Sequence, residues 1–295
     1  IQYLDYILYA LQVMSDDPGN PGQAAMYAMG QFTSIGGAAA QGLARWSGSA
    51  WSALGPGFLD STGASRPVQV AIYDDDGAGP RRPFVYAIGA FLQAGYDPAV
   101  GIARWDQHYW EPLGPMLNNS VHAMASLNGS LFVGGAFTQA DGLAAVSVAR
   151  WDGQGFATLG SGMNNHIDAF AVHNGRLFAG GKFTAAGGVA TGQVAQWDGT
   201  LWGPVGSGVY GNVDALVEYG GELYAGGSFS LMYPYIAKWD GSAQWRTVGA
   251  GTNGRVRVLC LNGSDLYAAG DFTSAGGVPA PGLARWDGAN WHAAP

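Results

Sequence analysis

A polar side chain lies between apolar neighbours at the start of the first predicted strand in each of six internal repeats. Aligning the repeats at this position collects residues of different chemistry: Tyr9, Gln69, His122, Asp168, Asp214 and Arg257. The polar residue differs from copy to copy, whereas its two neighbours are always apolar. This pattern is expected where strand ends surround a binding site for one asymmetric ligand. The alternative interpretation is that the strand starts are solvated and tolerate any residue.

Two of these residues are carboxylates from consecutive repeats. Asp168 and Asp214 would be neighbours if consecutive repeats pack side by side, and together with His122 they could bind a cation or act as an acid/base pair. The sequence contains no nucleophile motif, no paired histidines at helical spacing and no phosphate-binding loop before a helix. We therefore predict a non-catalytic site and keep catalysis as an alternative.

A second oxygen-rich segment lies in an insertion of the second repeat. Asp74, Asp75 and Asp76 precede a glycine and could chelate calcium, but they lack the ligand spacing of a recognised calcium loop. A solvated turn is the favoured interpretation. We therefore predict no cofactor, with calcium as the alternative.

The elements that must position these residues repeat along the whole chain. The segment 223–229 (Leu-Tyr-Ala-Gly-Gly-Ser-Phe), followed by Trp239-Asp240-Gly241, recurs six times with a period near 46 residues. Each copy contains four short runs that alternate or are rich in β-branched and aromatic residues, which predicts strands. Asn128-Gly129 and its counterparts predict tight hairpins, because both residues tolerate positive φ. The closing phenylalanines are Phe32, Phe91, Phe137, Phe183, Phe229 and Phe272.

Six copies of four antiparallel strands predict an all-β protein, a single six-bladed β-propeller domain over residues 1–295. In a propeller the first strand of each blade lines the central channel, so the six polar residues would lie at the channel mouth. The first strand of copy one would be 8–13, although residues 1–14 would also fit a short helix. The predicted blades are about 6–57, 68–115, 119–162, 165–208, 211–251 and 254–295.

The repeated glycines and tryptophans are interpreted as structural. A glycine pair on one strand removes side chains where a neighbouring ring or blade approaches closely, and rings fill the wedge-shaped gaps between blades. The lone Cys260 lies in an apolar run and is predicted to be a buried thiol. The tryptophans that fill the gaps would be Trp46, Trp105, Trp151, Trp197, Trp239 and Trp286.

Composition excludes several function classes. The chain is 48% hydrophobic and only 12% charged, with a net charge of −8 and no run of lysine or arginine, which disfavours a nucleic-acid partner or an anionic membrane. Nowhere do 18 apolar residues follow one another, so no membrane-spanning segment is expected. One cysteine rules out an intramolecular disulfide, and a domain of this size can be secreted without one.

The repeat unit resembles a known family. The pattern Leu-Tyr-Ala-Gly-Gly-x-Phe, then Ala-Arg-Trp-Asp-Gly, is similar to the tryptophan-rich, kelch-like propeller repeats of large secreted bacterial proteins and of the fungal cortical polarity-marker family. The resemblance is strongest at Phe137/Trp151, Phe183/Trp197 and Phe272/Trp286, and it departs in copy two, where Trp105-Asp-Gln replaces Trp-Asp-Gly. It implies a propeller that serves mainly as an extracellular binding or scaffold module.

The sequence therefore predicts a non-catalytic extracellular or periplasmic module, either a protein–protein interaction domain or a structural subunit. Its partner would be another protein or a glycan. One alternative is a carbohydrate-binding propeller with several equivalent aromatic pockets between blades. A second alternative is a polysaccharide-acting enzyme in which His122, Asp168 and Asp214 are the working groups. Fold alone does not choose between them.

Overall fold

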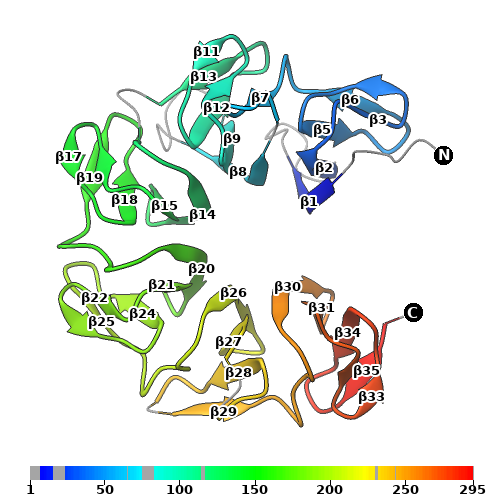
Figure 1. The fold of residues 1–295 in the computed structure, drawn as a ribbon, viewed down its shortest axis with the longest axis vertical. Coiled ribbons are helices and arrows are strands. Elements are labelled where there is room, and N and C mark those ends of the chain that lie inside the picture. The colour runs from blue at the N-terminus through cyan, green and yellow to red at the C-terminus, as the bar shows by residue number, and fades with distance from the viewer. Residues whose placement is uncertain are drawn as a thin grey trace. The chain divides into compact units, whose positions relative to one another are not determined.

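The computed structural model describes residues 7–15, 24–64, 66–74, 83–113, 117–229, 232–242 and 244–294. Over these residues the chain is all-β, with antiparallel strands and no helix (Figure 1). Accordingly, no described segment is a helix that could cross a membrane. The chain divides into two compact units: unit 1 comprises residues 1–145 with 149–158, and unit 2 comprises residues 146–148 with 159–295.

The predicted four-strand repeat is confirmed in both units, where each repeat forms one four-stranded antiparallel sheet. We number these sheets 1 to 6 in chain order. Sheets 1, 2 and 3 are β1 (Ile7–Ser15), β2 (Ala24–Gln31), β5 (Leu43–Trp46), β6 (Trp51–Ala53); β8 (Pro67–Tyr73), β9 (Phe84–Gly89), β12 (Ile102–Trp105), β13 (Trp110–Pro112); and β14 (Val121–Leu127), β15 (Ser130–Gly135), β18 (Val148–Trp151), β19 (Phe156–Thr158). Sheets 4, 5 and 6 are β20 (Ile167–His173), β21 (Arg176–Gly181), β24 (Val194–Trp197), β25 (Trp202–Pro204); β26 (Val213–Tyr219), β27 (Glu222–Gly227), β28 (Ile236–Trp239), β29 (Trp245–Thr247); and β30 (Val256–Asn262), β31 (Asp265–Gly270), β34 (Leu283–Trp286), β35 (Trp291–Ala293).

Short strand pairs lie in the loops between the second and third strands of sheets 1, 2, 3, 4 and 6, and the pair of sheet 2 is extended by a short strand from the connection between sheets 1 and 2. They are β3 (Ser34–Ile35) with β4 (Ala38–Ala39), β10 (Gln93–Ala94) with β11 (Asp97–Pro98) and β7 (Phe58–Leu59), β16 (Gln139–Ala140) with β17 (Leu143–Ala144), β22 (Ala185–Ala186) with β23 (Val189–Ala190), and β32 (Ser274–Ala275) with β33 (Val278–Pro279).

The local signals explain the strands and their turns. Asn128 and Gly129 have φ values of 49° and 68°, as the hairpin between β14 and β15 requires, and Asn174 and Gly175 repeat this geometry. The apolar segment near the start of the chain is the strand β1, which pairs with β2, rather than a helix. The turn residues and the two-residue alternation of side chains along each strand thus determine the repeat from local sequence.

The core lies between successive sheets within each unit. In unit 1, β8 packs against β1 and β2, and β14 packs against β8 and β9. In unit 2, β26 packs against β20 and β21, and β30 packs against β26 and β27. The first strand of each of these sheets therefore lies on the first two strands of the sheet before it. The closing phenylalanines of all six copies are buried, as predicted.

The fourth-strand tryptophans of sheets 2, 4, 5 and 6 form hydrogen bonds to the chain of the preceding repeat. Each one donates to a backbone carbonyl that lies just after the fourth strand of the preceding sheet. The indole N–H of Trp202 donates to the carbonyl of Leu159 at 3.2 Å, and that of Trp245 donates to Val205 at 2.9 Å. Trp110 and Trp291 repeat the contact. These rings are buried, whereas the third-strand tryptophans stressed by the sequence interpretation are buried or half-buried and make no such described bond.

The first glycine of the pair marks a close approach between sheets. A Cβ at Gly180 would lie 2.5 Å from Cγ1 of Val213, and a Cβ at Gly226 would lie 2.6 Å from Cγ1 of Val256. In both cases the valine belongs to the first strand of the next sheet. The prediction that these glycines admit a neighbouring repeat is thus confirmed in unit 2.

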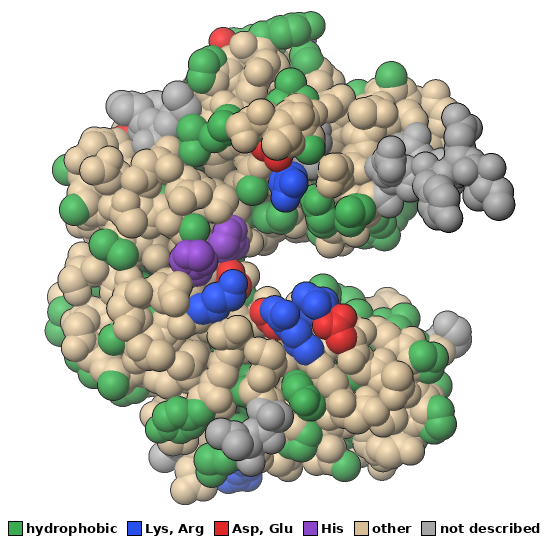
Figure 2. All heavy atoms as spheres, in the orientation of Figure 1, with side chains coloured by type: hydrophobic (Ala, Val, Ile, Leu, Met, Phe, Trp, Pro, Cys, Tyr) green, Lys and Arg blue, Asp and Glu red, His purple; other side chains and the backbone are tan. Residues whose placement is uncertain are grey.

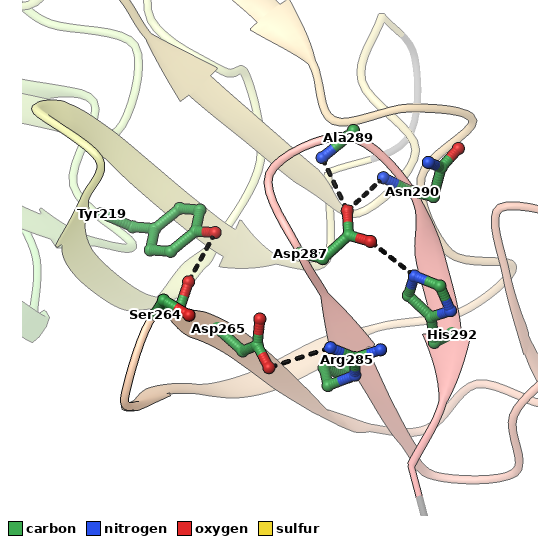
Figure 3. A network of polar contacts seen from close by, with 8 residues as sticks. All are labelled: Tyr219, Ser264, Asp265, Arg285, Asp287, Ala289, Asn290 and His292. Atoms are coloured by element: carbon green, nitrogen blue, oxygen red, sulfur yellow. Dashed lines mark hydrogen bonds and ion pairs between the residues drawn. The ribbon is translucent and has the colours of Figure 1, made fainter.

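An aspartate after the third-strand tryptophan caps the turn into the fourth strand. In sheet 6, Oδ1 of Asp287 accepts the N–H groups of Ala289 at 2.8 Å and Asn290 at 2.7 Å, while Oδ2 lies 2.7 Å from Nε2 of His292 (Figure 3). Asp106, Asp152, Asp198 and Asp240 cap the same turn in other copies. The Trp-Asp-Gly motif therefore forms and caps this turn.

The residue after this aspartate has a left-handed backbone, which gives a first prediction. Gln107 has φ 85°, where other copies place glycine with φ of 85° to 105°, such as Gly153 and Gly199. A side chain at such a φ destabilises the folded state by about 1–2 kcal/mol. Replacement by glycine recovers only part of this, because glycine gives the unfolded chain more conformational entropy. We expect Gln107→Gly to raise the free energy of unfolding by about 1 kcal/mol in urea titrations. Gln154→Gly, one residue beyond the left-handed position, should lower it; a loss of stability in both variants would contradict this explanation.

The same turns predict an acid-labile fold. Backbone N–H donors hold the pKa values of Asp152, Asp198 and Asp287 below the ordinary value of 3.8. Because the folded-state pKa is depressed, this stabilisation is present above the unfolded value and is lost as the pH falls through the folded one. The melting temperature should therefore fall as the pH drops below about 4. A variant with Asp152→Asn and Asp287→Asn should show a shallower fall, and parallel curves would contradict the assignment.

The prediction of a buried Cys260 is wrong. The thiol is exposed, although partial desolvation raises its pKa. In sheet 5 the equivalent residue, Val217, packs against the core between sheets 5 and 6. Sheet 6 is the last sheet of unit 2, so no following sheet of that unit covers the corresponding face of β30.

Candidate binding site at the strand bulges

Five of the six predicted site residues lie at one structural feature, a β-bulge near the start of the first strand. At each bulge one residue of the first strand has no pairing partner on the second strand, and the register shifts there. An example is His122, which lies between the paired residues Val121 and Ala123. A bulge bends the strand locally and re-aims a side chain, and bulges are frequent beside functional sites. The bulged residues among the six predicted ones are Tyr9, His122, Asp168, Asp214 and Arg257.

The alignment of the second copy is corrected by one residue. There the register shift lies between Pro67 and Gln69, so Val68 is the bulged residue. Gln69 instead bonds sheet 2 to sheet 3, because its Nε2 donates to the carbonyl of Met124 at 3.2 Å and its Oε1 accepts the Met124 N–H at 2.9 Å. This two-way amide contact is a structural role.

The second glycine of the pair creates the bulge. In sheet 4 a Cβ at Gly181 would collide with the carbonyl oxygen of His166, which also accepts the N–H of Lys182 at 2.9 Å. Sheets 2, 3, 5 and 6 repeat this carbonyl contact. The glycine therefore lets the second strand close on the residue that precedes the bulge.

In unit 2 a bidentate ion pair occupies the bulge end of the sheets. Arg255 donates from Nε and Nη2 to the two carboxylate oxygens of Asp214, each at 2.6 Å. The Asp214 side chain is only 11% exposed. The hydrogen bond to Asp214 is the largest contribution that raises the pKa of Arg255, and the field of Asp168 adds to it. Both predicted carboxylates thus act on one guanidinium.

A second ion pair extends this cluster towards solvent. Arg257 contacts Asp271 at 2.6 Å, and its hydrogen bond lowers the pKa of Asp271. Both side chains are about half exposed. Figure 2 shows basic and acidic side chains touching near β26 and β30 of this unit. Asp214 and Asp271 are therefore each neutralised by an arginine and do not form a free acidic pocket.

The arrangement does not favour cation binding at Asp214, because a guanidinium already binds both carboxylate oxygens. No group of three or more His, Cys, Asp or Glu side chains among the described residues is placed to hold a metal. For the calcium candidate, Asp74 follows β8, and Asp75 and Asp76 lie outside the described residues.

The remaining predicted residues lie in unit 1 and pair locally. The Tyr9 hydroxyl donates to Oε1 of Gln31 at 3.3 Å. Nε2 of His122 lies 2.9 Å from the Ser120 hydroxyl. His122 thus belongs to unit 1, whereas Asp168 and Asp214 belong to unit 2. Their joint action as a catalytic group stays a prediction.

Sequence reasoning missed the residues that precede the bulges by two positions. Arg255 is one of them, and its counterparts in sheets 2, 3 and 4 are Arg66, Ser120 and His166. These positions vary as widely as the bulged ones, so an alignment of the copies extended upstream would have found them. Asp271, which follows the glycine of β31, could be recognised only from the structure.

The comparisons with known proteins concern the fold. No family model and no curated protein sequence matches the chain. Its structure is similar to the extracellular domain of BT4673 from B. thetaiotaomicron, described in one structure as part of a hybrid two component system (12% identity, TM-score 0.62) and in another as part of a one component system (13% identity, TM-score 0.60). Each likeness covers 99% of this chain but 34% of the other chain. The chain thus spans about a third of the length of the proteins it resembles.

Proposed function

We propose that the chain is a non-catalytic extracellular binding module in which the six sheets are the blades of one six-bladed β-propeller. The packing of each sheet on the preceding one within a unit supports the blade interpretation. The likeness to an extracellular domain over 99% of the chain supports the location. The partner, a glycan or another protein, is recognised at the bulge end of the sheets, where the polar residues vary from copy to copy.

One observation carries the non-catalytic assignment. An acid/base pair needs a carboxyl group that can exchange a proton during the reaction. Asp214 instead has both of its oxygens engaged in charge-assisted hydrogen bonds to Arg255, so neither oxygen is placed to exchange a proton with a substrate. The polysaccharide-acting enzyme is therefore the less favoured function.

An assay for new reducing ends separates binding from hydrolysis. The purified chain is incubated with neutral and acidic polysaccharides, and both the retained protein and the released reducing ends are measured. We expect release no greater than in buffer alone. Release that disappears in the Asp168→Asn/Asp214→Asn variant would contradict the non-catalytic function and establish the enzyme.

Small-angle scattering tests the propeller. A compact domain of 295 residues has a radius of gyration of about 19 Å. We expect the monomer to give this value, because six blades in one ring form a single compact body. A markedly larger radius would contradict the single propeller and indicate two separate bodies.

The aromatic positions bear on the form that glycan binding would take. Among the described residues no tryptophan is exposed, so the repeated tryptophans do not offer a set of open pockets. Exposed Ile7, Leu11 and Val13 on β1 offer an apolar surface to a protein partner. The kelch-like and polarity-marker resemblance remains part of the proposal, because it rests on the repeat motif.

A further inference from the structure

A polar groove lies in unit 1 at the bulge end of sheets 2 and 3. Its volume is about 280 Å³. One wall is the loop before β8, with Asp60 and Arg66, and the other is the segment before β14, with Asn119 and Ser120. Ala90, Leu92 and Val100 contribute aliphatic surface between them. None of these residues was singled out by the sequence.

The first wall holds a fixed and electrically neutral pair. Nε of Arg66 lies 2.9 Å from Oδ2 of Asp60, and Oδ1 of Asp60 accepts the Thr62 N–H and hydroxyl and the Ala64 N–H. The Thr62 hydroxyl is the largest cause of the lowered pKa of Asp60. The aspartate is therefore ionised and balances the arginine. The guanidinium keeps further N–H donors beyond Nε, and its side chain is 48% exposed.

The second wall presents an amide and a hydroxyl. Oδ1 of Asn119 accepts the Ser120 N–H at 2.8 Å, which orients the side chain and leaves its NH₂ group, on an exposed residue, for a ligand. The Ser120 hydroxyl is held by His122 at 2.9 Å. The predicted residue His122 therefore acts here as a positioning residue for Ser120.

The surface between the walls is apolar and accessible. Leu92 is 48% exposed, and Ala90 is also exposed. An aliphatic surface flanked by oriented donors suits a ligand that has an apolar face and hydroxyl groups around its edge. Among the described residues of the lining, the charged ones are Asp60 and Arg66, which cancel, so they give little net attraction to an anion.

We propose that this groove binds a neutral hexose unit of a glycan. This inference rests on the proposed function as a binding module and names its ligand class. The aliphatic surface contacts the C–H face of the sugar ring. Arg66, Asn119 and Ser120 bond its hydroxyl groups. One groove built from non-repeated residues replaces the several equivalent aromatic pockets of the alternative carbohydrate-binding prediction.

Saturation-transfer NMR with the whole chain tests the proposal. The probes are methyl glucoside, methyl galactoside and methyl mannoside, titrated separately. We expect saturation of at least one probe, and a Kd raised roughly three- to ten-fold by Asn119→Ala, which removes one or two hydrogen bonds. Leu92→Asp should abolish the signal by charging the apolar surface. Arg176→Ala, at an exposed arginine of unit 2, is the matched control and should leave the Kd unchanged.

Salt and charge probes test the neutral character of the ligand. The Kd for the hexoside should stay constant between 0.05 and 0.5 M salt, since screening acts on charges. Tighter, salt-sensitive binding of glucuronate or galacturonate would overturn the assignment to a neutral sugar. Absence of transfer to all three hexosides, or an unchanged Kd in both Asn119→Ala and Leu92→Asp, would overturn the groove. These failures leave the non-catalytic assignment intact, because only release of reducing ends contradicts it.

Discussion

Replacing Trp202 by alanine is expected to lower the free energy of unfolding by about 3–5 kcal/mol, the range for truncating a large buried ring. Trp202 is buried, its ring centroid lies 5.3 Å from that of the tilted Trp197 ring, and its indole N–H donates to the carbonyl of Leu159 at the end of the preceding repeat. Removing it both opens a cavity and leaves a carbonyl without its donor. Urea titration followed by circular dichroism measures the loss.

Two variants separate the contributions of the Trp202 ring. Trp202→Phe keeps an aromatic ring but loses the donor, and it should cost about 1–3 kcal/mol. Leu201→Ala removes the adjacent, exposed side chain and should cost little. If Trp202→Ala were no more destabilising than Leu201→Ala, fourth-strand tryptophans would not hold the repeats together.

The second large effect is expected at the glycine that forms the bulge. Gly181→Ala places a Cβ against the carbonyl oxygen of His166 and close to Ile167. Both contacts are backbone atoms of the paired strand, so the strand must move and the bulge that carries Asp168 must change. We expect a cost of about 3 kcal/mol, at the upper end for overpacking.

The control for Gly181 is another strand glycine of the same unit. A Cβ at Gly203 would meet nothing within 4 Å, so Gly203→Ala should be close to neutral. Thermal unfolding of the two variants measures the difference directly. Equal melting temperatures would show that the close approach of backbone at Gly181 is not a constraint on the fold.

Much of the fold could be predicted because its signals are local. Asn128-Gly129 predicts a hairpin by its own backbone preferences, and the recurring phenylalanines mark the core because each repeat buries the same position. The recurrence of the Trp-Asp-Gly motif is visible in the sequence, although the capping bonds of Asp287 required the structure. The prediction for Cys260 was wrong because burial there depends on a neighbouring sheet rather than on the local run.

The candidate site was predictable only in part because its partners are distant in sequence. Asp214 and Arg255 are 41 residues apart, on consecutive sheets, and no local pattern pairs them. In the second copy the bulge precedes Gln69 by one residue, and a shift of one residue in a strand exchanges its faces. The groove beside Arg66 depends on loops that do not repeat, so periodicity gave no signal for it.

Glycan binding by the purified chain tests the central claim that the bulge end recognises a ligand without catalysis. On a glycan array, the wild-type chain and Asp168→Asn are expected to bind the same glycans with exposed neutral hexoses, whereas Leu92→Asp should lose them. Binding of all three proteins to the same glycans would place recognition elsewhere on the chain. Binding by none of them would contradict glycan recognition at the bulge end, and cleavage of the arrayed glycans by the wild type would contradict the non-catalytic assignment.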